Sequence, residues 1–493
     1  MLLLGIDLGT SFIKVSVVDA ATSKCVAQVS YPEVESSISS LKSGWAEQSP
    51  EMWWTNVQAA ILKAHATKQY NPKDIGAIGI AYQMHGLVAV DKNNNELRDS
   101  IIWCDSRAVD IGNKAFDVIG KEKCLSDLLN SPGNFTASKL AWVKENEPDI
   151  YSKIKTVMLP GDFIAMRLTG QTTTTISALS EGVFWDFKRD ELSEDILNYF
   201  EFKKQLFPKI NNVFSNHGNL KANVAFALSL NKNIPVTYKA GDQQNNALSL
   251  NVFDPGDFAA TAGTSGVIYG VTDKLTYDKQ SKINTFAHVN HSSTLNRLGV
   301  LLCINGTGIM NSWVKKYIGG NLSYKEMDLE ASKINVGSDG LTILPFGNGA
   351  ERMLDNQNIG AYISQVDLNK HSSAHIYRAA QEGIAFAFRY GLEIMKSNGM
   401  YIQNIRAGKS NMFKSAVFTD AFVNSTNISL SLYDSDGSVG AAVGAGIGAG
   451  FYKNSKEAFA GLAPIETLMP NNAALYNIKY EEWKSELEKH ISK

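Results

Sequence analysis

The chain of 493 residues has little cysteine and almost no net charge. Its four cysteines, Cys25, Cys104, Cys124 and Cys303, are far apart, and none forms a C-x-x-C pair. They are too few for a disulfide framework and wrongly spaced for zinc, so we expect buried, reduced thiols in a cytoplasmic protein. The formal net charge of −2 offers no basic surface for nucleic acid or an anionic membrane.

Long apolar runs are also missing. The first residues, MLLLGID, lead directly into strand-like sequence, without the basic region and long apolar core of a signal peptide. The Gly-rich segment 438–452 is too short to span a bilayer. Its small residues favour a helix packed closely on a sheet or a nucleotide, so we expect no membrane segment.

The composition that remains is typical of a globular protein, with 44% apolar and 19% charged residues. The length exceeds what one core usually accommodates. We therefore predict two α/β domains, residues 1–250 and 251–493, separated near the turn-forming sequence NVFDPG at 251–256.

One pattern occurs in both halves: LLGIDLGTSFIKV at 3–15 and FAATAGTSGVIYG at 258–270. Each predicts two strands joined by a Gly-Thr-Ser turn. Backbone N–H groups in such turns bind anions. A single turn of this kind is weak evidence, but its repetition in matching strand contexts predicts two hairpins that hold a polyphosphate from opposite sides of a cleft.

Other segments read as regular elements. The sequence predicts a helix at 50–66 after a Ser-Pro start, a buried strand at 75–81, a short helix near 192–200, and a long helix at 376–399 that ends at Gly. A strand entering a turn is expected within 402–411.

Two charged residues flank the first turn. Asp7 ends the first strand, where a carboxylate beside a polyphosphate would attract Mg²⁺; alternatively it bonds its own backbone in a turn. Lys14 follows the turn and could reach a phosphate as a point charge. A solvated strand lysine is an equally good interpretation of Lys14.

Asp242 stands between a strand-like run and a helix-like run, and four amide side chains follow it. Such a carboxylate can orient a hydroxyl group and accept its proton during phosphoryl transfer; it can also simply cap the following helix. Gln83, Met84 and His85 follow a buried strand, where ligand sites form in open α/β sheets, although a lone His is more often structural. Asp105 and Arg107 could pair with each other.

Taken together, the motifs resemble the FGGY carbohydrate kinases, and among them the xylulokinases, over nearly the whole chain. The matching segments are GIDLGTS, SGWAEQSPEMWW, YQMHG, FTASKLAWVKENEP, AGDQQN, TAGTSGV and SVGAAVGAGIG. The resemblance implies a two-domain, actin-like (ribonuclease H-like) α/β ATPase fold with its active site in the interdomain cleft. It also implies ATP and Mg²⁺, a small ketose or polyol substrate, and a homodimer.

The resemblance assigns roles to individual residues. Asp242 would be the catalytic base, and Gln83, Met84, His85 and Gln243 would accompany it at the sugar. The remaining roles concern the nucleotide: Thr10, Ser11, Lys14, Gly263 and Thr264 at the phosphates, Asp7 near Mg²⁺, and Gly308, Gly408 and Asn411 along the rest of ATP.

Three departures from the family pattern concern the substrate and the nucleotide. Arg406–Lys409 replaces a run of glycines, which leaves nucleotide contacts in that loop open. Gln243 stands where xylulokinases usually have Asn and resembles glycerol kinases, and Cys104 replaces an Asn.

The expected activity is ATP-dependent phosphorylation of D-xylulose to D-xylulose 5-phosphate. A glycerol kinase, or another polyol or sugar-acid kinase, is the alternative that Gln243 favours. A non-catalytic actin-like sugar sensor is a third interpretation, against which the presence of Asp242 argues.

Overall fold

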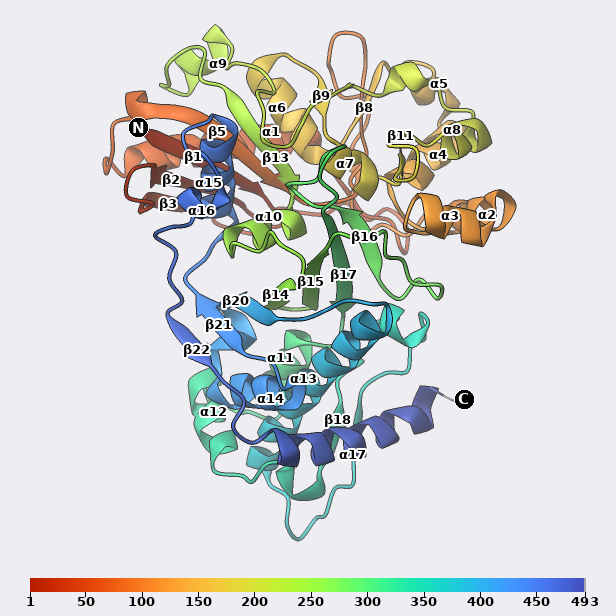
Figure 1. Cartoon of the computed structure of the whole chain (residues 1–493), viewed down its shortest axis with the longest axis vertical. Helices are drawn as coiled ribbons and strands as arrows, with labels where there is room; N and C mark the ends of the chain where they lie inside the picture. Colours follow the sequence, from red (N-terminus) through yellow and green to blue (C-terminus); the bar gives the residue numbers. More distant parts are fainter. Residues whose placement is uncertain (492–493) are drawn as a thin grey trace.

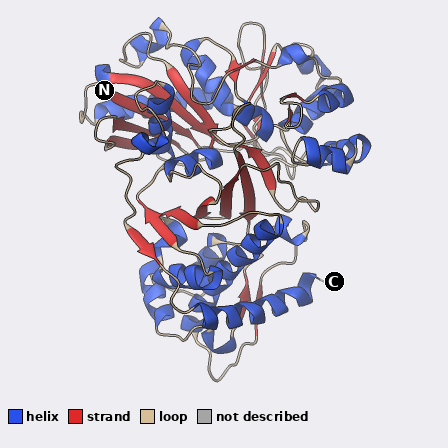
Figure 2. Cartoon of the chain, viewed as in Figure 1, coloured by secondary structure: helices blue, strands red, loops and turns tan. Residues whose placement is uncertain are grey.

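The computed structural model describes residues 1–491 and consists of two α/β lobes, each built on a mixed sheet (Figures 1 and 2). The five-stranded first sheet runs in the order β13 (Val236–Gly241), β5 (Ile75–Tyr82), β1 (Leu2–Leu8), β2 (Ile13–Asp19), β3 (Cys25–Tyr31). The seven-stranded second sheet runs in the order β16 (Asn284–Ala287), β17 (Leu298–Ile304), β15 (Gly266–Thr272), β14 (Asp257–Ala262), β20 (Asn404–Gly408), β21 (Leu430–Tyr433), β22 (Glu466–Leu468).

Both predicted hairpins form, and they occupy equivalent places in the two sheets. β1 pairs antiparallel with β2, closing at Leu8 and Ile13, and parallel with β5. β14 pairs antiparallel with β15, closing at Ala262 and Gly266, and parallel with β20. The repeated Gly-Thr-Ser turn therefore reflects a repeated strand plan, as expected.

The predicted helix at 50–66 is α1 (Pro50–Ala66), with the expected limits. The side chain of Ser49 caps it by accepting the N–H of Met52 at 3.3 Å, and Pro50 occupies the first turn. Its buried face, which includes Trp53 and Trp54, packs on β2 and β3. The cap and this apolar face together explain why the helix could be located from sequence.

The predicted long helix is α13 (Ser373–Ser397), which begins three residues earlier than expected. It packs on α14 (Ala416–Thr426), α12 (Tyr324–Ser332) and β17 in the core of the second lobe. Ser372 and His375 form a reciprocal cap at its start. His375 is not a typical residue for this cap, which explains the missed first turn.

The small-residue helix α15 (Gly437–Gly448) crosses back from the second half of the sequence and packs on β1 and β5 of the first sheet (Figure 1). The approach requires glycine in both strands. A Cβ on Gly5 would lie 1.8 Å from the carbonyl oxygen of Ser438, and one on Gly79 would lie 2.0 Å from that of Ala441. The expectation of a closely packed helix is confirmed.

The edge strand β16 joins the two halves. Helix α7 (Ile176–Glu181) contacts it through Ser177, whose hydroxyl donates to the carbonyl of Ala287 at 3.0 Å, and through Ser180, whose hydroxyl accepts the N–H of Ala287 at 2.9 Å. Asn130 donates to the carbonyl of Thr285 at 2.6 Å. These contacts place the second sheet directly against the residues that follow β5.

Other helices of the two lobes are α4 (Thr136–Asn146), α6 (Pro160–Thr169), α8 (Glu194–Phe200), α10 (Asp242–Ser249), α11 (Gly308–Tyr317) and α17 (Ala473–Ile491). Among residues 1–491, no helix has both the length and the apolar character that crossing a bilayer requires.

The four cysteines are free, and the expectation that they are buried holds only for Cys124, because Cys303 is half-buried and the other two are exposed. Cys25 is exposed because it begins the edge strand β3, and Cys104 is exposed in the loop after β7 (Ser100–Ile101).

Candidate active site

Asp7 lies within strand β1, directly before the first Gly-Thr-Ser turn and opposite Lys14 on β2. Burial raises the pKa of its carboxyl group to about 6, against the lowering effect of Lys14 and with a further rise from Asp436. A Cβ on Gly437 would lie 2.5 Å from Oδ2 of Asp7, so the first residue of α15 touches this carboxylate. One buried carboxylate suits Mg²⁺, which binds proteins through one or two carboxylates and keeps several waters.

Lys14 is an ion-pair partner of Asp436, with 3.0 Å between Nζ and Oδ2. Asp436 is the N-cap of α15 and also accepts the N–H of Ser438 at 2.9 Å. Lys14 is therefore not simply solvated, as one interpretation had it. Its ammonium group lies between the first turn and the start of α15.

The first turn is held by a hydrogen-bond network around Thr10. Its hydroxyl donates to Oε1 of Gln83 at 3.1 Å and accepts from the indole of Trp103 at 3.0 Å. Gln48 donates to the carbonyl of Thr10 at 2.8 Å and accepts from Nε2 of Gln83 at 3.2 Å. The side chain of Gln83, which we expected at the sugar, here supports the turn that carries Thr10 and Ser11.

The second turn packs on the start of α11. The N–H of Gly308 donates to the carbonyl of Gly263, and the N–H of Ile309 to that of Thr264, both at 3.0 Å. A Cβ on Gly263 would lie 3.6 Å from Nδ2 of Asn411. The structure thus brings together Gly263, Thr264, Gly308 and Asn411, four residues expected along the nucleotide.

The departure at Arg406–Lys409 directs two long side chains away from this cluster. The guanidinium of Arg406 donates to the carbonyls of Leu250, at 3.1 Å, and Asn251. Lys409 pairs with Glu466 at 2.7 Å. Gly408 lies between them at the end of β20, and a Cβ there would be 3.7 Å from the carbonyl oxygen of Ser435, next to Asp436.

Asp242 is the first residue of α10, and Gly241 occupies the N-cap position without a side-chain cap. The interpretation of Asp242 as the cap is therefore wrong. Burial raises the pKa of its carboxyl group to about 7, and the charge of Asp7 adds to the rise, against hydrogen bonding to Gln243. A carboxyl group with this pKa ionises near neutral pH, which suits a general base.

Met84 and His85 follow β5, and His85 has a φ of 60°. The ring of His85 packs edge-on against Phe135, with 4.8 Å between centroids, and lies 5.4 Å from Phe286 of β16. Burial lowers its pKa to about 3, so the imidazole is neutral. Nδ1 lies 2.8 Å from the carbonyl oxygen of Glu181. A neutral ring must donate its Nδ1 proton there, which leaves Nε2 as an acceptor for a hydroxyl group.

Lys139 is a residue to which sequence reasoning assigned no role beyond its place in the FTASKL motif. It is fully buried, and its ammonium group donates to the carbonyls of His85 at 3.0 Å and Ile102 at 2.9 Å. Burial lowers its pKa to about 7. Lys139 therefore ties the loop that carries Met84 and His85 to the loop that carries Trp103.

Arg352 reaches the same region from the second lobe, and no sequence motif points to it. Its guanidinium donates to Oδ1 of Asn284 on β16. Its positive charge contributes to the low pKa of His85, so the two side chains are neighbours. Within residues 1–491, no carboxylate lies within ion-pair distance of Arg352.

The expected ion pair between Asp105 and Arg107 is confirmed, with 2.6 Å between Oδ2 of Asp105 and Nη2 of Arg107.

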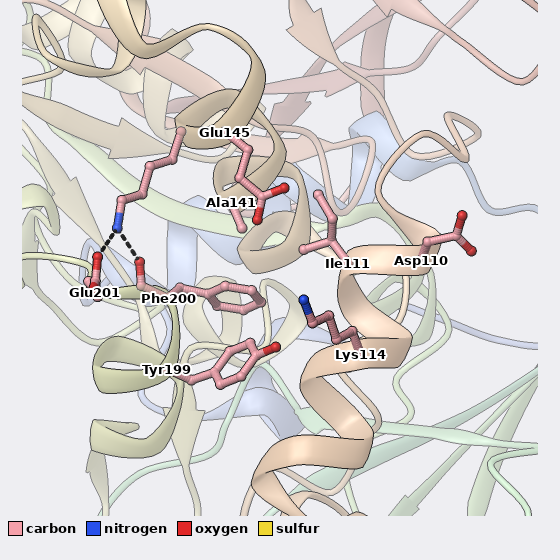
Figure 3. Close-up of a pocket in the computed structure, with 9 residues that line it drawn as sticks. Asp110, Ile111, Lys114, Ala141, Glu145, Tyr199, Phe200 and Glu201 are labelled. Carbon is pink, nitrogen blue, oxygen red and sulfur yellow. Dashed lines mark hydrogen bonds and ion pairs between the residues drawn. The ribbon is translucent and has the colours of Figure 1, made fainter.

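Two other features lie apart from these residues. A cavity of about 510 Å³ lies on the first lobe and is lined by residues of α2 (Val109–Ile119), α4 and α8 (Figure 3). At its edge Lys144 donates to the carbonyl of Phe200 and to Glu201, each at 2.8 Å. The carboxylates of Asp127, Asp186 and Asp195 converge, but lysines pair with two of them. The expected site residues line neither feature.

Comparison with known proteins decides the family. Residues 2–249 match the N-terminal domain, and residues 258–449 the C-terminal domain, of the FGGY family of carbohydrate kinases. The chain belongs to the FGGY family of carbohydrate kinases. The xylulose kinase of Haemophilus influenzae is 28% identical over 413 residues, covering 82% of this chain and 81% of that protein. The xylulose kinase of Lactococcus lactis is 27% identical over 490 residues, covering 98% and 95%.

Solved structures agree on the fold. A ligand-bound xylulose kinase from Lactobacillus acidophilus superposes with a TM-score of 0.90 at 21% identity, covering 100% of this chain and 98% of that one. A gluconate kinase from the same organism gives 0.88 at 21%, covering 99% and 97%. This FGGY kinase is accordingly a phosphotransferase that acts on an alcohol group of a carbohydrate, with ATP as co-substrate, on the expected two-domain fold.

Proposed function

We propose that this FGGY kinase transfers the γ-phosphoryl group of ATP to the 5-hydroxyl of D-xylulose, giving D-xylulose 5-phosphate. The observation that carries the proposal is the position of Asp242. Asp242 is the first residue of α10 and directly follows β13, which pairs with β5, the strand that leads to Met84 and His85. Its carboxyl group has a pKa of about 7. Relatives of similar length that are xylulose kinases support the choice of sugar.

Asp242 acts as the general base. Phosphoryl transfer has a loose transition state, so the base mainly orients the attacking hydroxyl and accepts its proton as the bond to phosphorus forms. The helix start near Asp242 stabilises its ionised form, while burial opposes ionisation. The balance leaves a base that is ionised at neutral pH and still basic enough to take a proton.

The phosphates of ATP bind between the two hairpin turns. Thr10, Ser11 and Lys14 contact them from the first sheet, and Gly263 and Thr264 from the second. Gly308, Gly408 and Asn411 border the rest of the nucleotide. Asp7 is the carboxylate that would hold Mg²⁺, which would supply positive charge to the phosphates.

The sugar lies against Met84, His85 and Gln243, near the base. The neutral ring of His85 offers Nε2 to a sugar hydroxyl, because Nδ1 is used by Glu181. Met84 supplies an apolar wall, and Gln243 follows the base directly. The guanidinium of Arg352 adds a donor from the second lobe, for which the structure provides no carboxylate partner among residues 1–491.

A coupled ADP-release assay tests the proposal with ATP and Mg²⁺ and a panel of D-xylulose, L-ribulose, L-xylulose, glycerol and gluconate. We expect a strong preference for D-xylulose, and we expect Asp242→Ala to bind ATP normally without phosphorylating the sugar. Preference for glycerol or gluconate would reject the proposed substrate. Normal turnover by Asp242→Ala would reject the proposed base.

The resemblance also leads us to propose a homodimer. Sedimentation equilibrium of the full chain tests it: a mass near twice 53.9 kDa supports the dimer, and a mass near 53.9 kDa rejects it.

A further inference from the structure

Glu181, the last residue of α7, has a side chain that is fully buried and has no cationic partner among residues 1–491. Its exposed fraction is 0%. The hydroxyl of Tyr82 lies close enough to lower the pKa of this carboxyl group by hydrogen bonding, but no well-aligned hydrogen bond reaches either carboxyl oxygen within residues 1–491. No Lys, Arg or His of residues 1–491 lies within ion-pair distance of it. Most buried carboxylates are paired, so an unpaired one needs an explanation.

The carboxyl group lies beneath the strand end that carries Asp242. A Cβ on Gly241 would be 2.7 Å from Oε2 of Glu181 and 2.7 Å from Oε1 of Gln244. One oxygen of each side chain therefore lies against Gly241. The same Cβ would be 2.8 Å from Cγ of Met84. Both polar atoms of the Gln244 side chain also lack partners. Glu181 and Gln244 thus form the layer directly under the junction of β13 and α10.

The charged and titratable groups that face the Glu181 carboxyl are acids or hydroxyls, and the imidazole of His85 approaches only its main-chain carbonyl. These acids and hydroxyls are Tyr82 of β5, Asp162 of α6, Asp242 of α10 and Tyr269 of β15. The nearby Lys239 of β13 already pairs with Asp162, at 2.5 Å. An ionised carboxylate in these surroundings would be desolvated, unpaired and close to other negative charges. Burial raises the pKa of Glu181 well above its usual value, with further rises from Asp242 and Asp162, although hydrogen bonding to Tyr82 lowers it.

The main chain of Glu181 reaches a second part of the site. Its carbonyl oxygen lies 2.8 Å from Nδ1 of His85 and fixes the tautomer and orientation of that ring. Preceding residues of α7 contact β16 through Ser177 and Ser180. One residue therefore connects the sugar-side ring, the start of α10 and the junction of the two lobes.

We propose that Glu181 is a positioning residue of the kinase, whose side chain works as an uncharged carboxylic acid beneath Gly241 and Gln244. Its O–H group donates to Oε1 of Gln244 and fixes the first turn of α10, and with it Asp242. Its main-chain carbonyl fixes His85. The proposal deepens the proposed function, because it assumes that Asp242 and His85 serve the reaction.

The first test measures stability against pH and does not depend on activity. In the unfolded chain Glu181 ionises near pH 4.5, whereas in the folded protein it keeps its proton. Folding therefore binds a proton, and this contribution makes the protein less stable as pH rises from about 5. Glu181→Gln cannot ionise, so its Tm relative to wild type should rise steadily between pH 5 and 8.

Glu326→Gln is the matched control. Glu326 is exposed in the capping box of α12, and hydrogen bonds from Ser323 lower its pKa. The Glu326 carboxyl group is ionised above pH 6 in both the folded and the unfolded chain. The Tm difference between Glu326→Gln and wild type should therefore stay constant from pH 6 to 8. A constant difference for Glu181→Gln over the same range would overturn the proposal, whichever sugar the enzyme uses.

The second test measures positioning, using the sugar that gives turnover. We expect Glu181→Gln, whose amide can still donate to Gln244, to keep kcat within about threefold at pH 7. Glu181→Leu should lower kcat by tenfold or more while the KM for ATP changes less than twofold. Normal kcat in a folded Glu181→Leu protein would overturn the positioning role. If Glu181→Leu does not fold, a tenfold loss of kcat in a folded Glu181→Gln protein would overturn it.

Discussion

The ammonium group of Lys14 and the carboxylate of Asp436 form a 3.0 Å ion pair across 422 positions of the sequence. The pair connects the strand that follows the first turn to the first residue before α15. It brings a cation to the place where the phosphates are proposed to bind, and holds it by a carboxylate that phosphate can replace.

We expect Lys14→Met to raise the KM for ATP about tenfold, because a charge-assisted contact to phosphate is lost, and to leave the KM for the sugar within twofold. Initial rates at varied ATP and sugar check both constants. Lys63→Met is the control, because Lys63 forms a similar exposed pair with Glu33. An unchanged KM for ATP would show that Lys14 only supports the structure.

The pKa of Asp242, raised to about 7 by burial, predicts the pH dependence of the reaction. A base must be ionised, so kcat/KM should fall tenfold per pH unit below about pH 7. His85, with a pKa of about 3, stays neutral from pH 5 to 8 and adds nothing to this slope. A requirement for charged Lys139 would produce the opposite slope, with activity falling as pH rises through 7. A profile that is flat from pH 5 to 8 would contradict the prediction.

The same raised pKa predicts a cost in stability. Between about pH 4 and 7 the unfolded chain ionises Asp242 while the folded protein holds the proton, so this contribution to the free energy of unfolding falls as pH rises. Asp242→Asn removes that loss and should be more stable than wild type by about 4 kcal/mol at pH 8, with little difference at pH 4. Urea unfolding at the two pH values measures it, and a less stable variant at pH 8 would show that the carboxylate is well solvated.

Arg352 is expected to bind the sugar from the second lobe. Its guanidinium bonds to Asn284 near His85, without a carboxylate partner among residues 1–491. We expect Arg352→Met to raise the KM for the sugar tenfold or more and to leave the KM for ATP within twofold. Arg297→Met serves as control, because Arg297 lies near Asp254 instead. Equal effects of the two substitutions on sugar KM would contradict this role.

The packing of α15 on the first sheet predicts that position 79 of β5 accepts only glycine. Gly79→Ala would place a Cβ 2.0 Å from the carbonyl oxygen of Ala441, so the helix must move. We expect a loss of about 3 kcal/mol in the free energy of unfolding. In Gly461→Ala the new Cβ meets nothing closer than 3.5 Å, and the change should stay within about 1 kcal/mol. Similar losses in both variants would reject the packing argument.

Local signals made much of this fold predictable. The two Gly-Thr-Ser turns are flanked by β-prone residues, and α1 carries a Ser-Pro start and an apolar face, so each is specified within about fifteen residues. The start of α13 was missed because its cap uses His375. The family motifs added the two-lobed arrangement, which no local pattern contains.

The parts of the site that could not be predicted depend on contacts between distant segments. Gln83 follows a strand that leads to the sugar side, yet its amide bonds Thr10 and Gln48. Arg352 and Glu181 stand in no motif, and the roles proposed for them rest on charged groups that have no oppositely charged partner within residues 1–491. An unpaired buried group is visible only when every neighbour is in place.

The packing of α15 on the first sheet has a consequence for folding during translation. Strands β1, β5 and β13 leave the ribosome long before residues 437–448, which cover them. Until then one face of that sheet, including Leu3, Ala77 and Tyr238, stays open to water or to a chaperone. Folding of the first lobe is thus completed only near the end of translation. A nascent chain stalled before residue 437 would expose an apolar surface that is prone to aggregation.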